Sequence, residues 1–174
     1  MKIGVVADTH NNWANFKKAI EWMNKENIQL ILHCGDICSQ ETIDQANKLF
    51  TGEVKYVKGN ADFELDLSRL PEGNRGSSTK SGPEKLEIVV EGKRIAFTHF
   101  PDIAKKLVKT GKFDLVFYGH THRPWDEKIA CLPAGRVSCH MINPGEMAGQ
   151  FYKPTFAVYD TETSSLELKI LELL

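Results

Sequence analysis

The segment KIGVVADTH, residues 2–10, joins a run of mostly apolar residues to two residue types that bind metal ions. Val, Ile and Gly dominate residues 2–7, which predicts a short buried strand. Asp8 and His10 follow at its end, two residues apart, so on an extended chain their side chains would face the same way. Open α/β sheets build their sites at the carboxyl ends of strands, so the segment predicts such a sheet with a site at this edge.

Four further apolar runs end in residues of the same kinds. In chain order, the ligand-type residues at these ends are Asp36 after Gly35, Asn60 after Gly59, His99, and His120 with His122 in the sequence Gly-His-Thr-His. The two carboxylate oxygens of Asp36 can bridge two cations. The amide of Asn60 offers a neutral oxygen, and its NH₂ group can hydrogen-bond an anion. Because five strand ends all present ligand types, the sequence predicts one shared metal site.

The first half of the chain alternates between strands and helices. Residues 13–23 carry apolar side chains at helical spacing after an Asn cap, and a second amphipathic helix follows Ser39. The predicted strands at residues 2–7, 30–33 and 54–57 are separated by these helices. Short links between such elements predict right-handed parallel crossovers.

The second half of the chain begins after residues 71–83, whose Pro, Gly and Ser content predicts an exposed loop. Its pattern predicts two antiparallel hairpins with a helix and a strand between them. The expected elements are strands at 86–90 and 94–97, a helix at 103–109, a strand at 115–118, and strands at 155–159 and 166–170. The expected architecture is an α/β fold of two packed mixed sheets with helices outside, in one domain spanning residues 1–174.

Composition narrows the classes of function. The 22 Lys and Arg residues against 23 Asp and Glu leave a formal net charge of -1, so the excess positive charge that binds long nucleic acid is missing. We find neither a secretory signal nor an apolar run of about 18 residues, and we expect a cytoplasmic protein without a membrane span. Its cysteines would then be reduced.

Other residues of ligand type have simpler interpretations. Cys34 and Cys38 fit either part of a zinc site or two small buried residues. We favour the second because no further cysteine pair at zinc spacing follows. We expect His33 to be a buried, hydrogen-bonded strand residue, and Arg123 to be a solvated surface residue rather than a phosphate contact. For His140 we expect a structural role, with a supporting position behind the site as the alternative.

The ordered motifs together resemble the calcineurin-like metallophosphoesterase superfamily, and in particular its small single-domain phosphodiesterases. The family pattern D-x-H, G-D, G-N, H and G-H-x-H is matched in order over nearly the whole chain. This resemblance implies a four-layer α/β/β/α sandwich and a centre of two divalent metal ions. It implies that one ion is held by Asp8, His10, Asp36 and His122, and the other by Asp36, Asn60, His99 and His120.

The resemblance also implies a metal-dependent phosphodiesterase. A hydroxide shared between the two ions would attack the phosphorus of a small phosphodiester. The catalytic residues would be Asp36, Asn60, His99 and His120. Four imidazole ligands favour Mn, Fe, Co, Ni or Zn over Mg, and we expect Mn. The sequence leaves a homo-oligomer open, and it predicts neither a long nucleic acid nor a membrane as partner.

Two alternative functions share this fold. One is a non-catalytic protein-binding scaffold, like the retromer subunit of the same fold. Such scaffolds tend to lose ligand histidines, and none is missing here. The other is a nucleotide-directed phosphatase or nuclease. The sequence shows no basic stripe or aromatic platform for long DNA, but it leaves small nucleotides open as substrates.

The sequence departs from the family pattern at two places. Many members carry a histidine directly after Gly-Asn, where it can protonate the leaving oxygen, but here Ala61 occupies that position and Asp62 follows. Relatives commonly read His-Gly-His around the lone histidine, whereas this chain reads His99-Phe100-Pro101. We therefore expect weak general-acid assistance. The departing oxygen would then rely on stabilisation by the metals, on water or on Asp62. We also expect Phe100 and Pro101 to narrow the mouth and to favour apolar contact with the substrate.

Overall fold

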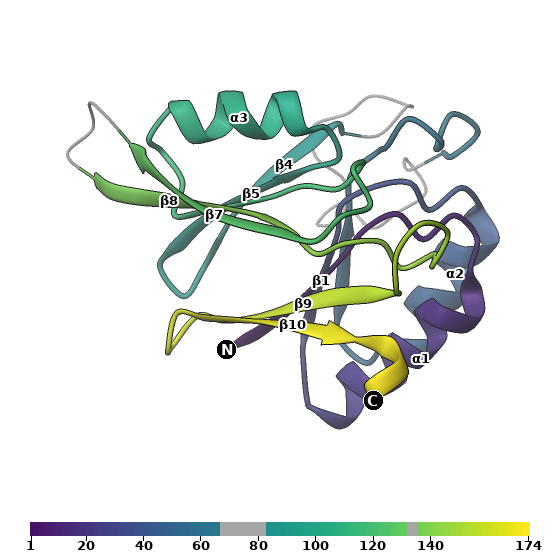
Figure 1. Ribbon diagram of the computed structural model, residues 1–174. Coiled ribbons are helices and arrows are strands. Elements are labelled where there is room, and N and C mark those ends of the chain that lie inside the picture. Colours follow the sequence, from purple (N-terminus) through teal and green to yellow (C-terminus); the bar gives the residue numbers. More distant parts are fainter. Residues whose placement is uncertain (67–82, 132–135) are drawn as a thin grey trace.

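Five strands form the first sheet of the computed structural model, which describes residues 1–66, 83–131 and 136–174 (Figure 1). In spatial order they are β10 (Ser165–Ile170), β9 (Thr155–Asp160), β1 (Lys2–Val6), β2 (Leu30–His33) and β3 (Glu53–Tyr56). β1, β2 and β3 run parallel to one another, while β9 and β10 are antiparallel to their neighbours. The sheet is therefore mixed, as predicted.

A second mixed sheet packs against the first. In spatial order its strands are β4 (Lys85–Val90), β5 (Lys93–Thr98), β6 (Leu115–Phe117), β8 (Arg136–Asn143) and β7 (Trp125–Cys131). The three inner strands are parallel, and the two edge strands are antiparallel to them. β4 and β5 form the first of the two predicted hairpins.

Helices cover the outer faces of both sheets. Figure 1 shows α3 (Pro101–Lys109) above the second sheet, and α1 (Trp13–Lys25) and α2 (Gln40–Leu49) against the first. Asn12 and Ser39 cap α1 and α2 as predicted, each accepting a hydrogen bond from a backbone N–H of the first turn. The chain ends in a short 3₁₀ helix, Leu171–Leu173. This order of layers confirms the α/β/β/α sandwich.

The core lies in three layers, one between the sheets and one under each set of helices. Along β1, Ile3 and Val5 face the second sheet, whereas Val6 packs beneath the helices. A strand that is buried on both faces carries a nearly continuous run of apolar residues, which explains the composition of residues 2–7. Because apolar contacts fill the space between the sheets, the polar residues of the site are found at the strand ends.

Two predicted elements differ from the structure, and a third prediction lies almost wholly outside the described residues. The hairpin of β7 and β8 was missed, because β7 is an edge strand whose Asp126-Glu127-Lys128 segment breaks the apolar alternation. The helix α3 begins at Pro101, two residues before the predicted start, because proline fits the first turn. The predicted loop at 71–83 lies outside the described residues except for Pro83. None of the helices in the described part of the chain combines the length and apolarity needed to cross a membrane.

Candidate metal centre

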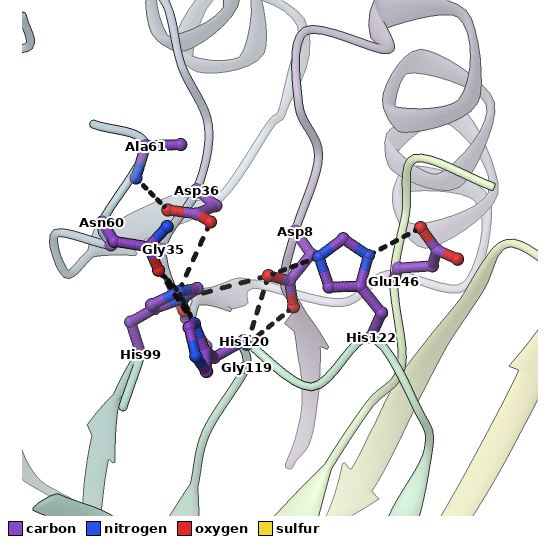
Figure 2. Close-up of polar contacts among 12 residues, drawn as sticks. Asp8, Gly35, Asp36, Asn60, Ala61, His99, Gly119, His120, His122 and Glu146 are labelled. Atoms are coloured by element: carbon purple, nitrogen blue, oxygen red, sulfur yellow. Dashed lines mark hydrogen bonds and ion pairs between the residues drawn. The ribbon is translucent and has the colours of Figure 1, made fainter. Parts of the chain in front are cut away.

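The ends of four strands, and the loop after β3, meet at one end of the sandwich. There the structure brings together all seven residues predicted as ligands, most of which Figure 2 labels. β1 leads into Asp8 and His10, β2 into Asp36, the loop after β3 carries Asn60, β5 leads into His99, and β6 into His120 and His122. Both sheets thus contribute ligands, and the site lies where the two sheets face each other.

The first group of ligand atoms contains Asp8 Oδ1, Asp36 Oδ2 and the Nε2 atoms of His10 and His122. His122 Nε2 lies 3.6 Å from Asp8 Oδ1, and His10 Nε2 lies 3.7 Å from Asp36 Oδ2. The two imidazole nitrogens are 3.3 Å apart, and their rings are stacked. These four atoms converge on one small volume.

The second group contains Asn60 Oδ1, His99 Nε2, His120 Nδ1 and again Asp36 Oδ2. Asn60 Oδ1 lies 2.9 Å from His99 Nε2 and 2.8 Å from His120 Nδ1. His99 Nε2 lies 3.4 Å from Asp36 Oδ2 and 3.2 Å from His120 Nδ1. One oxygen of Asp36 therefore borders both groups. Its other oxygen accepts a hydrogen bond of 2.8 Å from the backbone N–H of Ala61.

These spacings fit bound metal ions. Ligands about 2.1 Å from an ion lie about 3.0 Å apart in an octahedron and about 3.4 Å apart in a tetrahedron. His99 Nδ1 is 2.9 Å from the Cys34 carbonyl, which can only accept, so Nε2 carries the lone pair that faces Asn60 and Asp36. Acceptor atoms that converge in this way repel one another unless a cation lies between them.

Electrostatics favour the same conclusion. Asp8 and Asp36 are both buried. Burial, together with the nearby charge of Asp36, raises the pKa of Asp8 well above its usual range. Burial also lowers the pKa of His10 and of His99, which keeps both imidazoles neutral and able to bind metal. Divalent ions would relieve the repulsion between the two buried carboxylates.

The backbone of the ligand loops is unusual. Five of the seven residues adopt left-handed backbone conformations, with φ of 52° at Asp8, 43° at His10, 58° at Asp36, 71° at His120 and 59° at His122. Such conformations cost roughly 1 kcal/mol or more each outside glycine. Hydrogen bonds between the loops hold them, including 3.0 Å from the Asp8 N–H to the Gly35 carbonyl and 2.9 Å from the His10 N–H to the Asp36 carbonyl.

Two glycines of the motifs are required by close approach. Gly35 has a φ of 90°, and a side chain there would come within 2.8 Å of the His99 ring. A side chain at Gly59 would meet the carboxylate of Asp36. Both positions therefore exclude larger residues, because the ligands of neighbouring loops occupy the space.

Glu146 is a residue of the candidate site that the sequence analysis missed. It is buried, and its Oε2 atom accepts a hydrogen bond of 2.9 Å from His122 Nδ1 (Figure 2). Burial acts to raise the pKa of Glu146, but hydrogen bonds from the backbone N–H groups of Tyr152 and Gln150 and from His122 outweigh it, and the pKa is lowered. The carboxylate therefore keeps the proton of His122 on Nδ1 and its lone pair on Nε2.

Asp62 has a different role from the predicted one. It is buried, and its two oxygens accept hydrogen bonds of 2.8 Å from the backbone N–H groups of four residues, namely Asp36, Ile37, Cys38 and Gly59. A carboxylate surrounded by four donors is an acceptor that ties the loop after β2 to the loop after β3. It is therefore not placed to protonate a leaving group, which corrects the expectation from sequence.

The remaining candidates take mostly structural positions. His33 is buried and hydrogen-bonded to Thr9 Oγ1 at 2.8 Å, as expected. Cys34 is buried, whereas Cys38 is only half-buried, with Sγ 3.5 Å from His10 Nδ1. His140 contacts Asp126 of the neighbouring strand, which agrees with the structural role.

Two further residues of the sequence analysis, Arg123 and Phe100, lie near the candidate centre. Arg123 is exposed, and its guanidinium lies 5.7 Å from the centre of the Trp125 ring. Phe100 packs edge-on against the ring of the ligand-type residue His99, with 5.1 Å between ring centroids. The expected apolar side chain therefore does stand beside the candidate centre.

Comparison with known proteins points to one superfamily. The calcineurin-like phosphoesterase superfamily domain matches residues 1–164. The phosphodiesterase MJ0936 of Methanocaldococcus jannaschii is 30% identical over 176 residues, which cover 99% of this chain and 100% of that protein. The structure of an archaeal phosphodiesterase superposes with a TM-score of 0.83 at 29% identity, covering 98% of this chain and 99% of that one. Vps29 of Cryptosporidium parvum, at 19% identity and a TM-score of 0.68 over 97% and 95% of the two chains, shares the fold.

Proposed function

Since this chain belongs to the calcineurin-like phosphoesterase superfamily, we propose that it is a phosphodiesterase that hydrolyses small phosphodiesters with two bound divalent metal ions, preferably Mn. The observation that carries the proposal is the position of Asp36. Its Oδ2 atom lies 3.7 Å from a nitrogen of the first ligand group and 3.4 Å from a nitrogen of the second. A carboxylate oxygen in that position suits two adjacent cations.

The proposed ligands divide as the two groups do. Asp8, His10, Asp36 and His122 would hold one ion, and Asp36, Asn60, His99 and His120 the other. Two divalent cations bring more positive charge than the two carboxylates remove, so the centre would attract the negative charge of a phosphate. The ions would neutralise the phosphate oxygens and lower the pKa of a water molecule so that it can act as nucleophile.

The residues of the chain itself bind and orient. The Asn60 oxygen faces His99 and His120, so its NH₂ group points to the other side, where it can donate to a phosphate oxygen. The backbone N–H of Ala61 fixes the Asp36 carboxylate. Ala61 has no group that could protonate a leaving oxygen, and Asp62 is occupied by backbone donors. The leaving group would therefore take its proton from water.

Metal titration and one substitution test the proposal. Calorimetric titration with Mn should give two ions per chain, and the Mn-loaded protein should hydrolyse bis(p-nitrophenyl) phosphate. Asp36→Asn should abolish turnover and weaken the binding of both ions, because it removes one of the two carboxylate charges among the proposed ligands. Asp44→Asn, an exposed acid on α2, is the matched control and should behave like the natural protein. One ion or none at saturation, or full activity of Asp36→Asn, would contradict the proposal.

A further inference from the structure

A shallow groove of about 310 Å³ opens beside the candidate metal centre. Its walls come from the loop after β6, the start of β7 and the loop before β9, and the lining residues are Tyr118, Thr121, Arg123, Trp125 and Tyr152. Thr121 is the residue between the two proposed ligands His120 and His122. The groove therefore borders the loop that carries these two proposed ligands.

Aromatic side chains gather at this groove although water surrounds them. Trp125 is 49% exposed, Tyr152 is 50% exposed, and the neighbouring Phe151 is 74% exposed. The Phe151 ring stands edge-on to the ring of His122, with 5.1 Å between their centroids. Exposed aromatic residues that cluster beside a polar centre are typical of a ligand-binding surface.

The backbone beneath these rings is held in place. The N–H groups of Phe151 and Tyr152 both donate to the buried carboxylate of Glu146, which also holds His122. Trp125 is the first residue of β7 and pairs with Asn143 of β8. The backbone that carries these rings is therefore anchored. This limits the backbone entropy that would be lost when a ligand binds.

We propose that this groove is a subsite for a flat aromatic ester group of the phosphodiester whose phosphate lies at the metal centre, and this proposal rests on the proposed function. The rings of Trp125 and Tyr152 offer apolar faces for stacking. The Arg123 guanidinium, already over the Trp125 ring, adds a cation that favours aromatic over aliphatic groups. The ester group can be a simple aryl ring or a nucleobase, since both present the same flat face.

Product analogues test the subsite by binding rather than by turnover. Calorimetry on the Mn-loaded protein should show phenyl phosphate binding about 5- to 20-fold more tightly than methyl phosphate, a gain in the range of one stacked ring. A third titration, with adenosine 5′-monophosphate, shows whether the groove prefers a nucleobase or a simple aryl ring. Either ranking of the nucleotide and phenyl phosphate supports the subsite, provided that both bind more tightly than methyl phosphate.

Substitutions in the groove test which residues cause the tighter binding of phenyl phosphate. Trp125→Ala with Tyr152→Ala should remove the preference for phenyl phosphate and leave methyl phosphate binding unchanged. Val89→Ala is the matched control, because Val89 is 69% exposed on β4 at the opposite edge of the second sheet. Equal binding of phenyl and methyl phosphate, or an unchanged preference in the double variant, would overturn the subsite. If the preference is present but no diester is hydrolysed, the subsite stands and the proposed function fails.

Discussion

Replacing Glu146 by glutamine removes one charge from the buried support of His122 without changing the size of the side chain. All four of its hydrogen-bond partners are N–H donors. Oε2 accepts from His122 Nδ1 and the backbone of Gln150, both at 2.9 Å, and Oε1 accepts from the backbones of Phe151 and Tyr152. A glutamine amide has only one oxygen, so its NH₂ group must face two of these donors in either orientation.

Each orientation has a distinct cost. With the NH₂ group toward His122, the ring must accept at Nδ1, and its proton moves to Nε2, the atom that lies 3.6 Å from Asp8 Oδ1 in the first ligand group. With the NH₂ group toward Phe151 and Tyr152, two buried backbone donors lose their acceptor. An unsatisfied buried donor costs about 1–3 kcal/mol. Loss of such an outer partner typically lowers metal affinity by about 10- to 100-fold.

We therefore expect Glu146→Gln to lower the affinity for one of the two Mn ions by about 10- to 100-fold. It should also lower the free energy of unfolding of the metal-free protein by roughly 2–4 kcal/mol. Calorimetry gives the affinity, urea unfolding gives the stability, and ¹⁵N NMR of the imidazole nitrogens gives the tautomer of His122. The control is Asp62→Asn, which loses a buried carboxylate with four backbone donors but no imidazole partner. It should lower stability and leave the tautomer unchanged. An unaltered tautomer together with natural Mn affinity in Glu146→Gln would refute the reasoning.

Two further predictions concern pH and the leaving group. Burial lowers the pKa of His33 to about 3, so below pH 6.5 the unfolded chain binds more protons than the folded one, and stability falls as the pH decreases from 6.5 toward 3. Between pH 7 and 5, the free energy of urea unfolding of metal-free protein should fall by about 1–2 kcal/mol more than in His33→Gln, and equal losses would contradict this. Because Ala61 offers no proton, rates should drop steeply as the leaving-group pKa rises, and Ala61→His should speed alkyl diesters by up to about 10²-fold. A flat dependence in the natural protein would mean that another group donates the proton.

Local patterns in the sequence were enough to predict much of the fold and the ligand-type residues. Apolar runs that end in Asp, Asn or His, and the helical spacing of apolar residues between them, are patterns among residues that lie close together in the chain. A single sequence therefore displays them. The parallel order of β1, β2 and β3 followed from this alternation, whereas the four layers were implied by the family resemblance. The hairpin of β7 and β8 did not follow, because β7 is an exposed edge strand that needs no apolar alternation, and only its pairing with β8 defines it.

The tertiary structure alone decided how the ligands are arranged. That Asp36 borders both groups depends on where the ends of β1, β2, β5 and β6 meet, and no spacing along the chain encodes those distances. Glu146 follows a turn like many surface acids, and its importance comes from His122, 24 residues earlier in the chain. The same holds for Asp62. The missing imidazole at position 61 made Asp62 a candidate proton donor, but the structure shows that Asp62 accepts from four backbone N–H groups. Sequence determines which groups can bind and react. Packing determines which of them meet, because hydrogen bonding and burial act between residues that are distant along the chain.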